Sequence, residues 1–249
     1  MMANAMTFEG RRALVTGGSA GIDRSVCEAL LEQGASVVSL ARTVGDLTHP
    51  RLQCHLIDLS DLGALRHLAA QLTQADPFDI LVNNAGVVRN TLLQDVEDGE
   101  FELLVDLHLR AATVLAQAVT PIMRQRGFGR IVNLSSRALV GMVGRTVYSA
   151  TKAALIAMTR TWALELGPQG ITVNAVSPGP TVTPMLEADI PSDSAKARSL
   201  AASIPVRRLG QPDDVARAVL FFADPKNGWI TGQNLFVCGG ASVGTALPF

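Results

Sequence analysis

The order of short apolar runs along this chain constrains its fold more than any other feature. Each run is short and consists mainly of Val, Ile and Leu, and a longer amphipathic stretch follows almost every one. Runs this apolar are typical of strands covered on both faces, and regular strand–helix alternation predicts βαβ units in a parallel sheet. We therefore expect a single-domain Rossmann-type α/β fold, a doubly wound parallel sheet of about seven strands with helices on both faces.

The element boundaries follow from the same pattern. The expected strands are Arg12–Thr16, Ser36–Ala41, Leu52–Ile57, Ile80–Asn83, Arg130–Ser135, Thr172–Ser177 and Asn234–Val237. The expected helices are Ile22–Gln33, Leu62–Thr73, Glu100–Gln125, Tyr148–Leu166 and Asp213–Ala223. No linker or repeat divides residues 1–249, so we expect one domain. A proline-punctuated stretch around 181–207 follows a strand end, which is typical of a substrate lid.

Composition excludes several classes of function. The chain has 21 Lys and Arg against 22 Asp and Glu, which argues against nucleic acid or an anionic membrane surface as the main partner. Its 3 cysteines form no CxxC pair, so we expect no disulfide framework, no metal and a reducing cytoplasm. We also expect no membrane span, because no uninterrupted apolar run approaches about 18 residues.

A glycine-rich turn joins the first expected strand to the first expected helix. Gly17, Gly18 and Gly21 occupy this turn, and residues without a Cβ let the backbone approach a pyrophosphate on the helix N-terminus. A plain βα turn is the alternative. The position directly after the first strand of a βαβ series favours a dinucleotide site.

The only tyrosine, Tyr148, lies four residues before Lys152, one of three lysines. Residues four apart share one helical face, so the phenol and the ammonium can converge on one site. A tyrosine pKa of about 10 must fall by some three units for the phenol to act as a base near pH 7, and a nearby lysine charge favours that change. Just upstream, Ser135 and Ser136 end a strand, where a hydroxyl can hold a substrate oxygen.

Taken together, these motifs resemble the short-chain dehydrogenase/reductase family, classical type, and are similar to its 3-oxoacyl-carrier-protein reductases. The matching pieces span nearly the whole chain: Thr16-Gly17-x-x-x-Gly21-Ile22, Asp58-Leu59, Asn83-Asn84-Ala85-Gly86, Ser136, Tyr148-x-x-x-Lys152, Asn174-x-x-x-Pro178-Gly179 and Ile230-Thr231-Gly232-Gln233.

The resemblance implies roles for individual residues. Tyr148 would exchange the proton, Lys152 would adjust its pKa and bind ribose, and Ser136 would anchor the carbonyl. The family more often has thirteen residues from serine to tyrosine, a spacing that Ser135 gives and Ser136 does not, so Ser135 remains the alternative. The implied cofactor contacts are Gly17, Ser19, Gly21, Ile22, Asp58, Leu59, Asn84, Ala85, Gly86, Tyr148, Lys152, Pro178, Gly179, Thr181 and Thr183.

Three positions depart from the family pattern. Asp23 replaces the last glycine of the turn, where its carboxylate either faces the pyrophosphate or turns outward to cap exposed amides. His108 replaces the usual asparagine of a proton relay, and it either relays protons or has a structural role. Cys238 replaces an aspartate and is expected to be a small buried filler.

The choice of cofactor depends on Arg42, at the end of the second expected strand. An acidic residue there would bond the ribose 2′-hydroxyl, whereas an arginine suits a 2′-phosphate. We therefore expect NADP(H), with NAD(H) as the alternative if Arg42 is only a surface residue.

These observations predict a cytoplasmic enzyme that transfers a hydride between NADP(H) and a small-molecule carbonyl or secondary alcohol. The resemblance also implies a homotetramer, or a homodimer, formed through the long helices Glu100–Gln125 and Tyr148–Leu166. The alternative from another class is a cofactor-poor, non-catalytic relative that acts as a binding or scaffold protein, which the departures at Asp23, His108 and Cys238 motivate.

Overall fold

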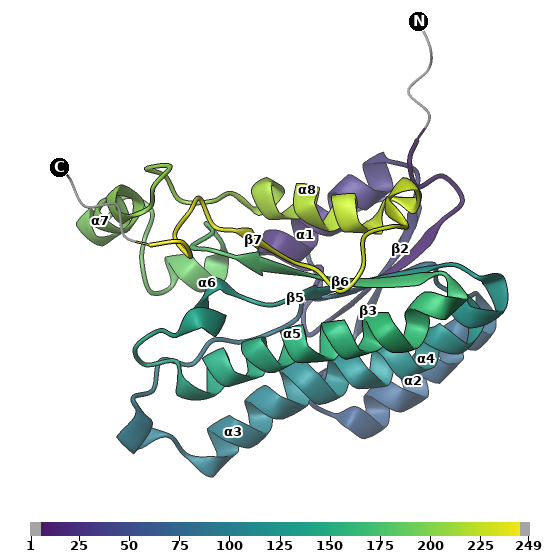
Figure 1. The fold of residues 1–249 in the computed structure, drawn as a ribbon, viewed down its shortest axis with the longest axis horizontal. Coiled ribbons are helices and arrows are strands. Elements are labelled where there is room, and N and C mark those ends of the chain that lie inside the picture. The colour runs from purple at the N-terminus through teal and green to yellow at the C-terminus, as the bar shows by residue number, and fades with distance from the viewer. Residues whose placement is uncertain (1–5, 245–249) are drawn as a thin grey trace, which may run out of the picture.

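A seven-stranded parallel sheet forms the centre of the molecule, with helices on both faces (Figure 1). The computed structural model describes residues 6–244. The strands are β1 Arg12–Thr16, β2 Ser36–Ala41, β3 Leu52–Leu56, β4 Ile80–Asn83, β5 Gly129–Leu134, β6 Ile171–Pro178 and β7 Asn234–Val237. The predicted fold class is therefore confirmed: the strands follow the order β3-β2-β1-β4-β5-β6-β7, and every neighbouring pair is parallel.

Two helical layers cover the sheet. Helices α1 Gly21–Glu32 and α8 Pro212–Ala223 lie on one face, and α2 Leu62–Ala75, α4 Ala111–Arg126 and α5 Thr146–Leu166 lie on the other (Figure 1). Helix α3 Asp98–Val105 continues into α4 through a π-helical turn, η2, Asp106–Arg110. Two short helices, α6 Pro184–Glu187 and α7 Ala195–Ser203, lie within the segment expected to be a lid.

Side chains that point to alternate faces along β1 explain why both helical layers pack against the sheet. Ala13 and Val15 face the cluster that contains α1 and α8, whereas Leu14 faces the cluster that contains α2 and α4. All three side chains are fully buried. The sequence of a strand covered on both faces is a continuous apolar run, and this is why these strands were predicted well.

The order of the strands indicates which edge of the sheet is expected to bind a ligand. The chain moves outward from β1 through β2 to β3, then crosses back to β4 on the other side of β1. In open α/β sheets, ligands bind outside the carboxyl ends of the strands at such a reversal. The ends of β1, β4 and β5 are therefore where the site is expected.

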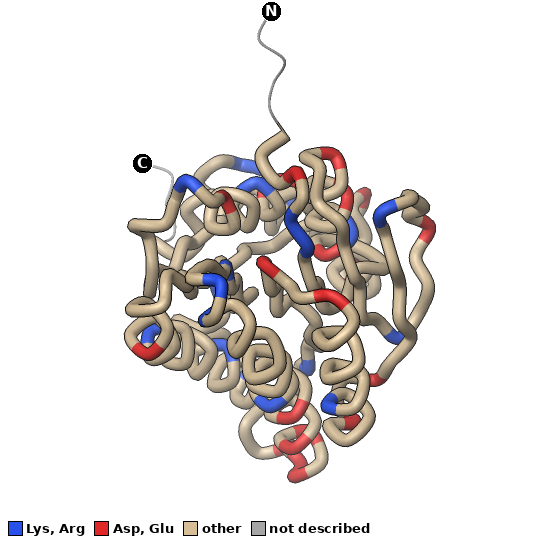
Figure 2. Tube along the Cα trace, turned by 90° about the vertical axis from the view of Figure 1, so that its right-hand side faces the viewer, with Lys and Arg blue, Asp and Glu red and all other residues tan. Residues whose placement is uncertain are grey.

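One helical run among the described residues, Asp98–Arg126, is long and apolar enough to cross a membrane by length and composition alone. Its residues Leu104, Leu115 and Met123 are fully buried in the core. A core helix passes the same test, so the run is weak evidence for a membrane. Figure 2 shows basic and acidic residues interspersed along the trace, in keeping with the balanced composition.

Candidate active site

The turn after β1 forms a cradle that fits a pyrophosphate. Gly17, Gly18 and Gly21 have φ angles of 102°, 76° and 64°, a region that L side chains rarely adopt. A Cβ on Gly18 would lie 1.9 Å from the Ser39 Oγ atom. The N-cap of α1, Ala20, makes no side-chain cap, so the N–H groups of the first turn that the Asp23 carboxylate does not face are left for a ligand. The residues present fit the dinucleotide that the sequence predicts.

Asp23 points into this cradle. Its Oδ2 atom accepts a hydrogen bond from the Gly18 N–H at 2.7 Å, and a Cβ on Gly17 would lie 1.7 Å from the same oxygen. Burial raises the pKa of Asp23 to about 6, although N–H groups of its own turn and of Gly18 lower it. Of the two orientations open from the sequence, the structure has the inward one, with the carboxylate capping an amide inside the loop.

The ends of β1 and β4 are joined by Thr16. Its hydroxyl accepts hydrogen bonds from the N–H groups of Asn84 and Ala85, both at 2.9 Å. Gly86 comes next, and a Cβ there would lie 2.9 Å from His108 Nε2 and 3.5 Å from Lys152 Nζ. The absence of a side chain at Gly86 therefore lets three elements meet at this edge.

Lys152 reaches the same place from α5. It is 4% exposed, and its Nζ atom donates a hydrogen bond to the Leu134 carbonyl at 2.8 Å. Burial lowers the pKa of Lys152 to about 8. The ammonium lies 5.8 Å from the centroid of the Tyr148 ring, so the predicted convergence of the two side chains is present.

The pKa of Tyr148 depends on several neighbours. Burial raises it above the ordinary value for tyrosine, whereas a hydrogen bond with Ser136 and the positive charge of Arg145 lower it. The sequence pointed to Lys152 as the group that lowers this pKa. In the structure the lowering comes from Ser136 and Arg145, and Lys152 directs a proton to the Leu134 carbonyl.

The two candidate serines have different surroundings. Ser135 is buried, and its hydroxyl donates to the Lys152 carbonyl at 2.7 Å. Ser136 begins the 3-10 turn η3, Arg137–Val140, where its Oγ accepts the Ala138 N–H at 3.1 Å. Of the two serines, Ser136 is the one whose hydroxyl lowers the pKa of Tyr148. Geometry thus favours Ser136 as the hydroxyl beside a reacting oxygen.

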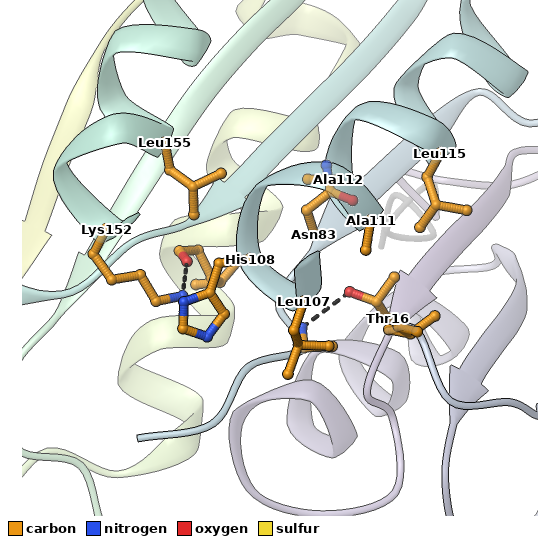
Figure 3. A pocket seen from close by; sticks show the side chains of 12 residues that line it. Thr16, Asn83, Leu107, His108, Ala111, Ala112, Leu115, Lys152 and Leu155 are labelled. Atoms are coloured by element: carbon orange, nitrogen blue, oxygen red, sulfur yellow. Dashed lines mark hydrogen bonds between the residues drawn. The ribbon is translucent and has the colours of Figure 1, made fainter. Parts of the chain in front are cut away.

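His108 lies in the π-helical turn η2, 2% exposed, with both ring nitrogens engaged. Nε2 accepts the Val87 N–H at 3.2 Å, and Nδ1 lies 2.9 Å from the Thr151 hydroxyl, which itself donates to the Tyr148 carbonyl. The ring lies beside Lys152 at the edge of a cavity of about 10 Å³, room for one water (Figure 3). Burial, then the Lys152 charge, lowers the pKa of His108 to about 2.

A neutral His108 has a consequence for stability. Because its pKa is lower in the folded chain than in the unfolded chain, folding becomes less favourable as pH falls below about 6.5. We expect the free energy of unfolding to fall by about 1.4 kcal/mol per pH unit from this residue alone. Denaturant unfolding of wild type and His108→Asn at pH 7.5 and 5 measures it. A stability gap between the two that does not change with pH would contradict the neutral assignment.

The residues expected near the adenosine lie after β2 and β3. Arg42 is exposed, and its charge helps to lower the pKa of Asp58, which accepts two hydrogen bonds from Ser60. Thr43 donates to the Ser19 hydroxyl at 3.3 Å, so the loop after β2 leans over the glycine-rich turn. The Leu59 side chain is buried in the core, which leaves its backbone for any ligand.

The segment after β6 lies on the cradle. Gly179 packs so closely that a Cβ there would lie 2.7 Å from Cys238, a buried residue whose thiol lies 3.1 Å from the Ser242 hydroxyl. Thr181 is buried and pairs with Gly210 in a short bridge. The Thr183 methyl would lie 3.1 Å from a Cβ on Gly21. Pro178, at the end of β6, begins this segment.

Two site features escaped the sequence analysis. Thr151 is the partner of His108, and its position one residue before Lys152 was the available signal. Asn90 donates to Asp189 at 3.0 Å, joining the loop after β4 to the segment after β6, and no sequence spacing points to that pair. Within residues 6–244, no three His, Cys, Asp or Glu side chains are grouped to hold a metal ion.

Known proteins share the sequence pattern and the fold of this chain. The family model described as enoyl-(acyl carrier protein) reductase matches residues 17–242. The chain is 37% identical over 248 residues to a (2S)-[(R)-hydroxy(phenyl)methyl]succinyl-CoA dehydrogenase subunit of Thauera aromatica, covering 96% of this chain and 99% of that one. It is 36% identical over 245 residues to a 3-oxoacyl-[acyl-carrier-protein] reductase of Vibrio harveyi, covering 94% and 98%.

Solved structures of related proteins have the same fold as this chain. A short chain dehydrogenase/reductase family protein is 39% identical with a TM-score of 0.87, covering 96% of this chain and all of that one. ElxO with NADP bound is 26% identical with a TM-score of 0.87, covering 94% and 99%.

The fold, the site and these likenesses define an oxidoreductase class that works with NAD(P) on CH–OH and C=O groups. The chain belongs to the short-chain dehydrogenase/reductase family, classical type, and is similar to its 3-oxoacyl-carrier-protein reductases.

Proposed function

We propose that this protein transfers a hydride between NADP(H) and a small carbonyl or secondary alcohol. The observation that carries the proposal is the meeting of Ser136, Tyr148 and Lys152 at the carboxyl edge of the sheet. These groups are a hydrogen-bond donor, a proton carrier and a cation, which are what reduction of a carbonyl needs besides a hydride. The non-catalytic alternative gives no reason for the lone tyrosine to lie there.

Each residue has a chemical task in this proposal. When bound, the nicotinamide supplies or accepts the hydride. The Ser136 hydroxyl donates a hydrogen bond to the carbonyl oxygen of the substrate, and Tyr148 donates its phenolic proton to that oxygen as negative charge develops. The positive charge of Arg145 and the hydrogen bond of Ser136 then favour the phenolate. In alcohol oxidation the proton moves the other way.

The cofactor would lie along the sheet edge. Gly17, Ser19, Gly21 and Ile22 would hold the pyrophosphate, and Lys152 the nicotinamide ribose. Further contacts would come from the loops after the other strands: Asp58, Leu59, Asn84, Ala85, Gly86, Pro178, Gly179, Thr181 and Thr183. The segment 181–207, with α6 and α7, would close over the substrate. The contact of Thr183 with Gly21 supports this, because it brings that segment to the cradle.

A preference for NADP(H) is the finer part of the proposal, and Arg42 supports it. Replacing Arg42 with Ala removes a guanidinium that only a 2′-phosphate would use, and charge-assisted bonds are worth about 1.5–3 kcal/mol. We expect the dissociation constant for NADPH to rise at least tenfold and that for NADH to change little. Fluorescence titrations of wild type, Arg42→Ala and the matched control Arg66→Ala measure both. Equal losses for the two nucleotides would show that Arg42 does not read the 2′ position.

The relay role of His108 also stays a proposal. Its ring is placed beside Lys152, yet both nitrogens already have partners. A homotetramer, or a homodimer, built on α4 and α5 and a cytoplasmic location are proposed on the family resemblance.

Turnover tests the proposed function. Purified protein is mixed with NADPH and a panel of small ketones, 3-oxo esters and 3-oxoacyl thioesters, and the loss of NADPH absorbance is followed. We expect reduction of at least one member, and loss of that activity in Ser136→Ala. Binding of NADPH without turnover of any member, or of the matching alcohols with NADP⁺, would favour the binding-protein alternative.

A further inference from the structure

Arg145 is fixed beside the proposed reacting hydroxyl. It is the N-cap residue of α5, three residues before Tyr148, and its Cζ atom lies 5.8 Å from the centroid of the Tyr148 ring. Its N–H donates to the Met142 carbonyl at 3.2 Å, and its own carbonyl accepts the Ser149 N–H at 2.7 Å. The backbone at this position is therefore held at both ends.

The guanidinium of Arg145 is half-buried and poorly paired. Of its five N–H donors, Nη1 donates to the Arg89 carbonyl at 3.2 Å, and Arg145 forms no ion pair within 4.0 Å with any of residues 6–244. Burial lowers the pKa of Arg145, while the charges of Tyr148 and Asp189 raise it. A partly buried cation costs free energy unless hydrogen bonds or an opposite charge offset the lost hydration.

Arg130 is an arginine with a structural role, and its side-chain donors have acceptors within the chain. Its side chain donates to the carbonyls of Gly129 and Pro225, both at 2.9 Å, and its guanidinium stacks over Phe128 at 4.4 Å. Arg145 has no such set of acceptors. The contrast indicates that Arg145 is held for a partner that is not part of the chain.

A second arginine lies next to Ser136 in the chain. Arg137 directly follows Ser136, and its Nη1 atom donates to the Ala241 carbonyl at 3.2 Å. Its Nε atom is buried and has no acceptor among the described residues. Arg137 thus adds a second positive charge next to Ser136 in the chain, while Asp189, the acidic group whose charge raises the pKa of Arg145, is hydrogen-bonded to Asn90.

We propose that Arg145 binds a carboxylate of the substrate, so that this enzyme acts on oxo acids or hydroxy acids whose acid group lies a few bonds from the reacting carbon. This rests on the proposed function and adds the substrate class to it. A carboxylate matches the planar fork of a guanidinium with two parallel hydrogen bonds, and it neutralises a cation that is partly removed from water. Arg145 is then a specificity-determining residue.

A different role for Arg145 is to lower the pKa of Tyr148. That role would affect charged and neutral substrates alike, because the phenol serves both. The ratio between an acid and its ester therefore separates the two roles, and it is what the experiment measures.

The experiment measures equilibrium binding of three oxo acids and their methyl esters: 2-oxobutanoate, 3-oxobutanoate and 4-oxopentanoate. The protein is saturated with NADP⁺, the oxidised cofactor, so that the oxo compounds bind without being reduced. The same titrations are run without nucleotide, so that a failure to bind NADP⁺ is scored against the proposed function and leaves the Arg145 comparison readable. Wild type, Arg145→Gln, Arg145→Lys and the distant control Arg66→Gln are compared.

We expect wild type and Arg66→Gln to bind at least one oxo acid ten or more times tighter than its ester. In Arg145→Gln the two dissociation constants should agree within twofold, and Arg145→Lys should restore part of the preference. Asp189→Asn, which removes the facing negative charge, should strengthen binding of the acid and provides a second variant if Arg145→Gln does not fold. A preference for acids that survives in Arg145→Gln, or a wild type that shows none or binds none of the compounds, would overturn the proposal.

Discussion

We expect replacement of Tyr148 with Phe to lower kcat by at least about 10²-fold and to leave the fold intact. Phenylalanine keeps the ring that packs 5.6 Å from His108, centroid to centroid, but removes the proposed proton carrier. General acid–base catalysis contributes about 10²–10⁴-fold, and the chain has no second tyrosine to replace it. Steady-state rates on a substrate found in the turnover panel measure the effect.

Controls separate lost chemistry from lost structure. The dissociation constant for NADPH should stay within threefold of wild type, and the unfolding midpoint should not shift by more than a few degrees. A Tyr148→Phe variant that keeps more than a tenth of wild-type kcat would defeat the assignment of Tyr148 as the proton carrier.

We expect replacement of Asp23 with Gly to tighten nucleotide binding about tenfold or more. The carboxylate occupies the loop where a pyrophosphate would lie and takes up the Gly18 N–H. At about 5 Å and an effective dielectric constant of about 20, the repulsion between the two charges is roughly 3 kcal/mol before screening. The helix N-terminus offsets about 0.3–1 kcal/mol of this.

The dependence of nucleotide binding on salt and pH tests whether the charge of Asp23 causes the weaker binding of wild type. The deficit of wild type relative to Asp23→Gly should grow as ionic strength falls, because less salt screens the two charges. Because the pKa of Asp23 is raised to about 6, wild type should bind NADH more weakly as pH rises from 5 to 7, and Asp23→Asn should not. NADH is used because it lacks a 2′-phosphate that titrates in the same range.

Dissociation constants for wild type and Asp23→Gly that agree within twofold at both low and high salt would show that Asp23 does not oppose the cofactor. The exposed Asp46→Asn, which removes a carboxylate near the same helix, is the matched control for net charge.

The extent to which the sequence predicted this molecule follows from the range of each interaction. Strands such as Ile80–Asn83 were placed correctly because their burial on both faces leaves a continuous apolar run. Helix α5 begins at Thr146, two residues before the expected start, since helix ends depend on local capping. The π-helical turn at His108 and the helices α6 and α7 have no distinct period, so the sequence did not predict them.

In the candidate site, too, local features were predictable from the sequence and contacts between distant elements were not. The spacing of Tyr148 and Lys152 is a local property of one helix, and their convergence was predictable. The inward turn of Asp23 and the partners of His108 depend on contacts between distant elements, which one sequence leaves open. The pairing of Arg145 also depends on such contacts, because its acceptor is on the loop after β4.

The most direct test of the account is a fluorescence titration of the purified wild-type protein with NADPH and with NADH. Binding to the cradle at the carboxyl edge predicts saturation by both nucleotides, with the smaller dissociation constant for NADPH and with loss of that difference in Arg42→Ala. Failure of both nucleotides to bind, in Asp23→Gly as well as in wild type, would contradict the account.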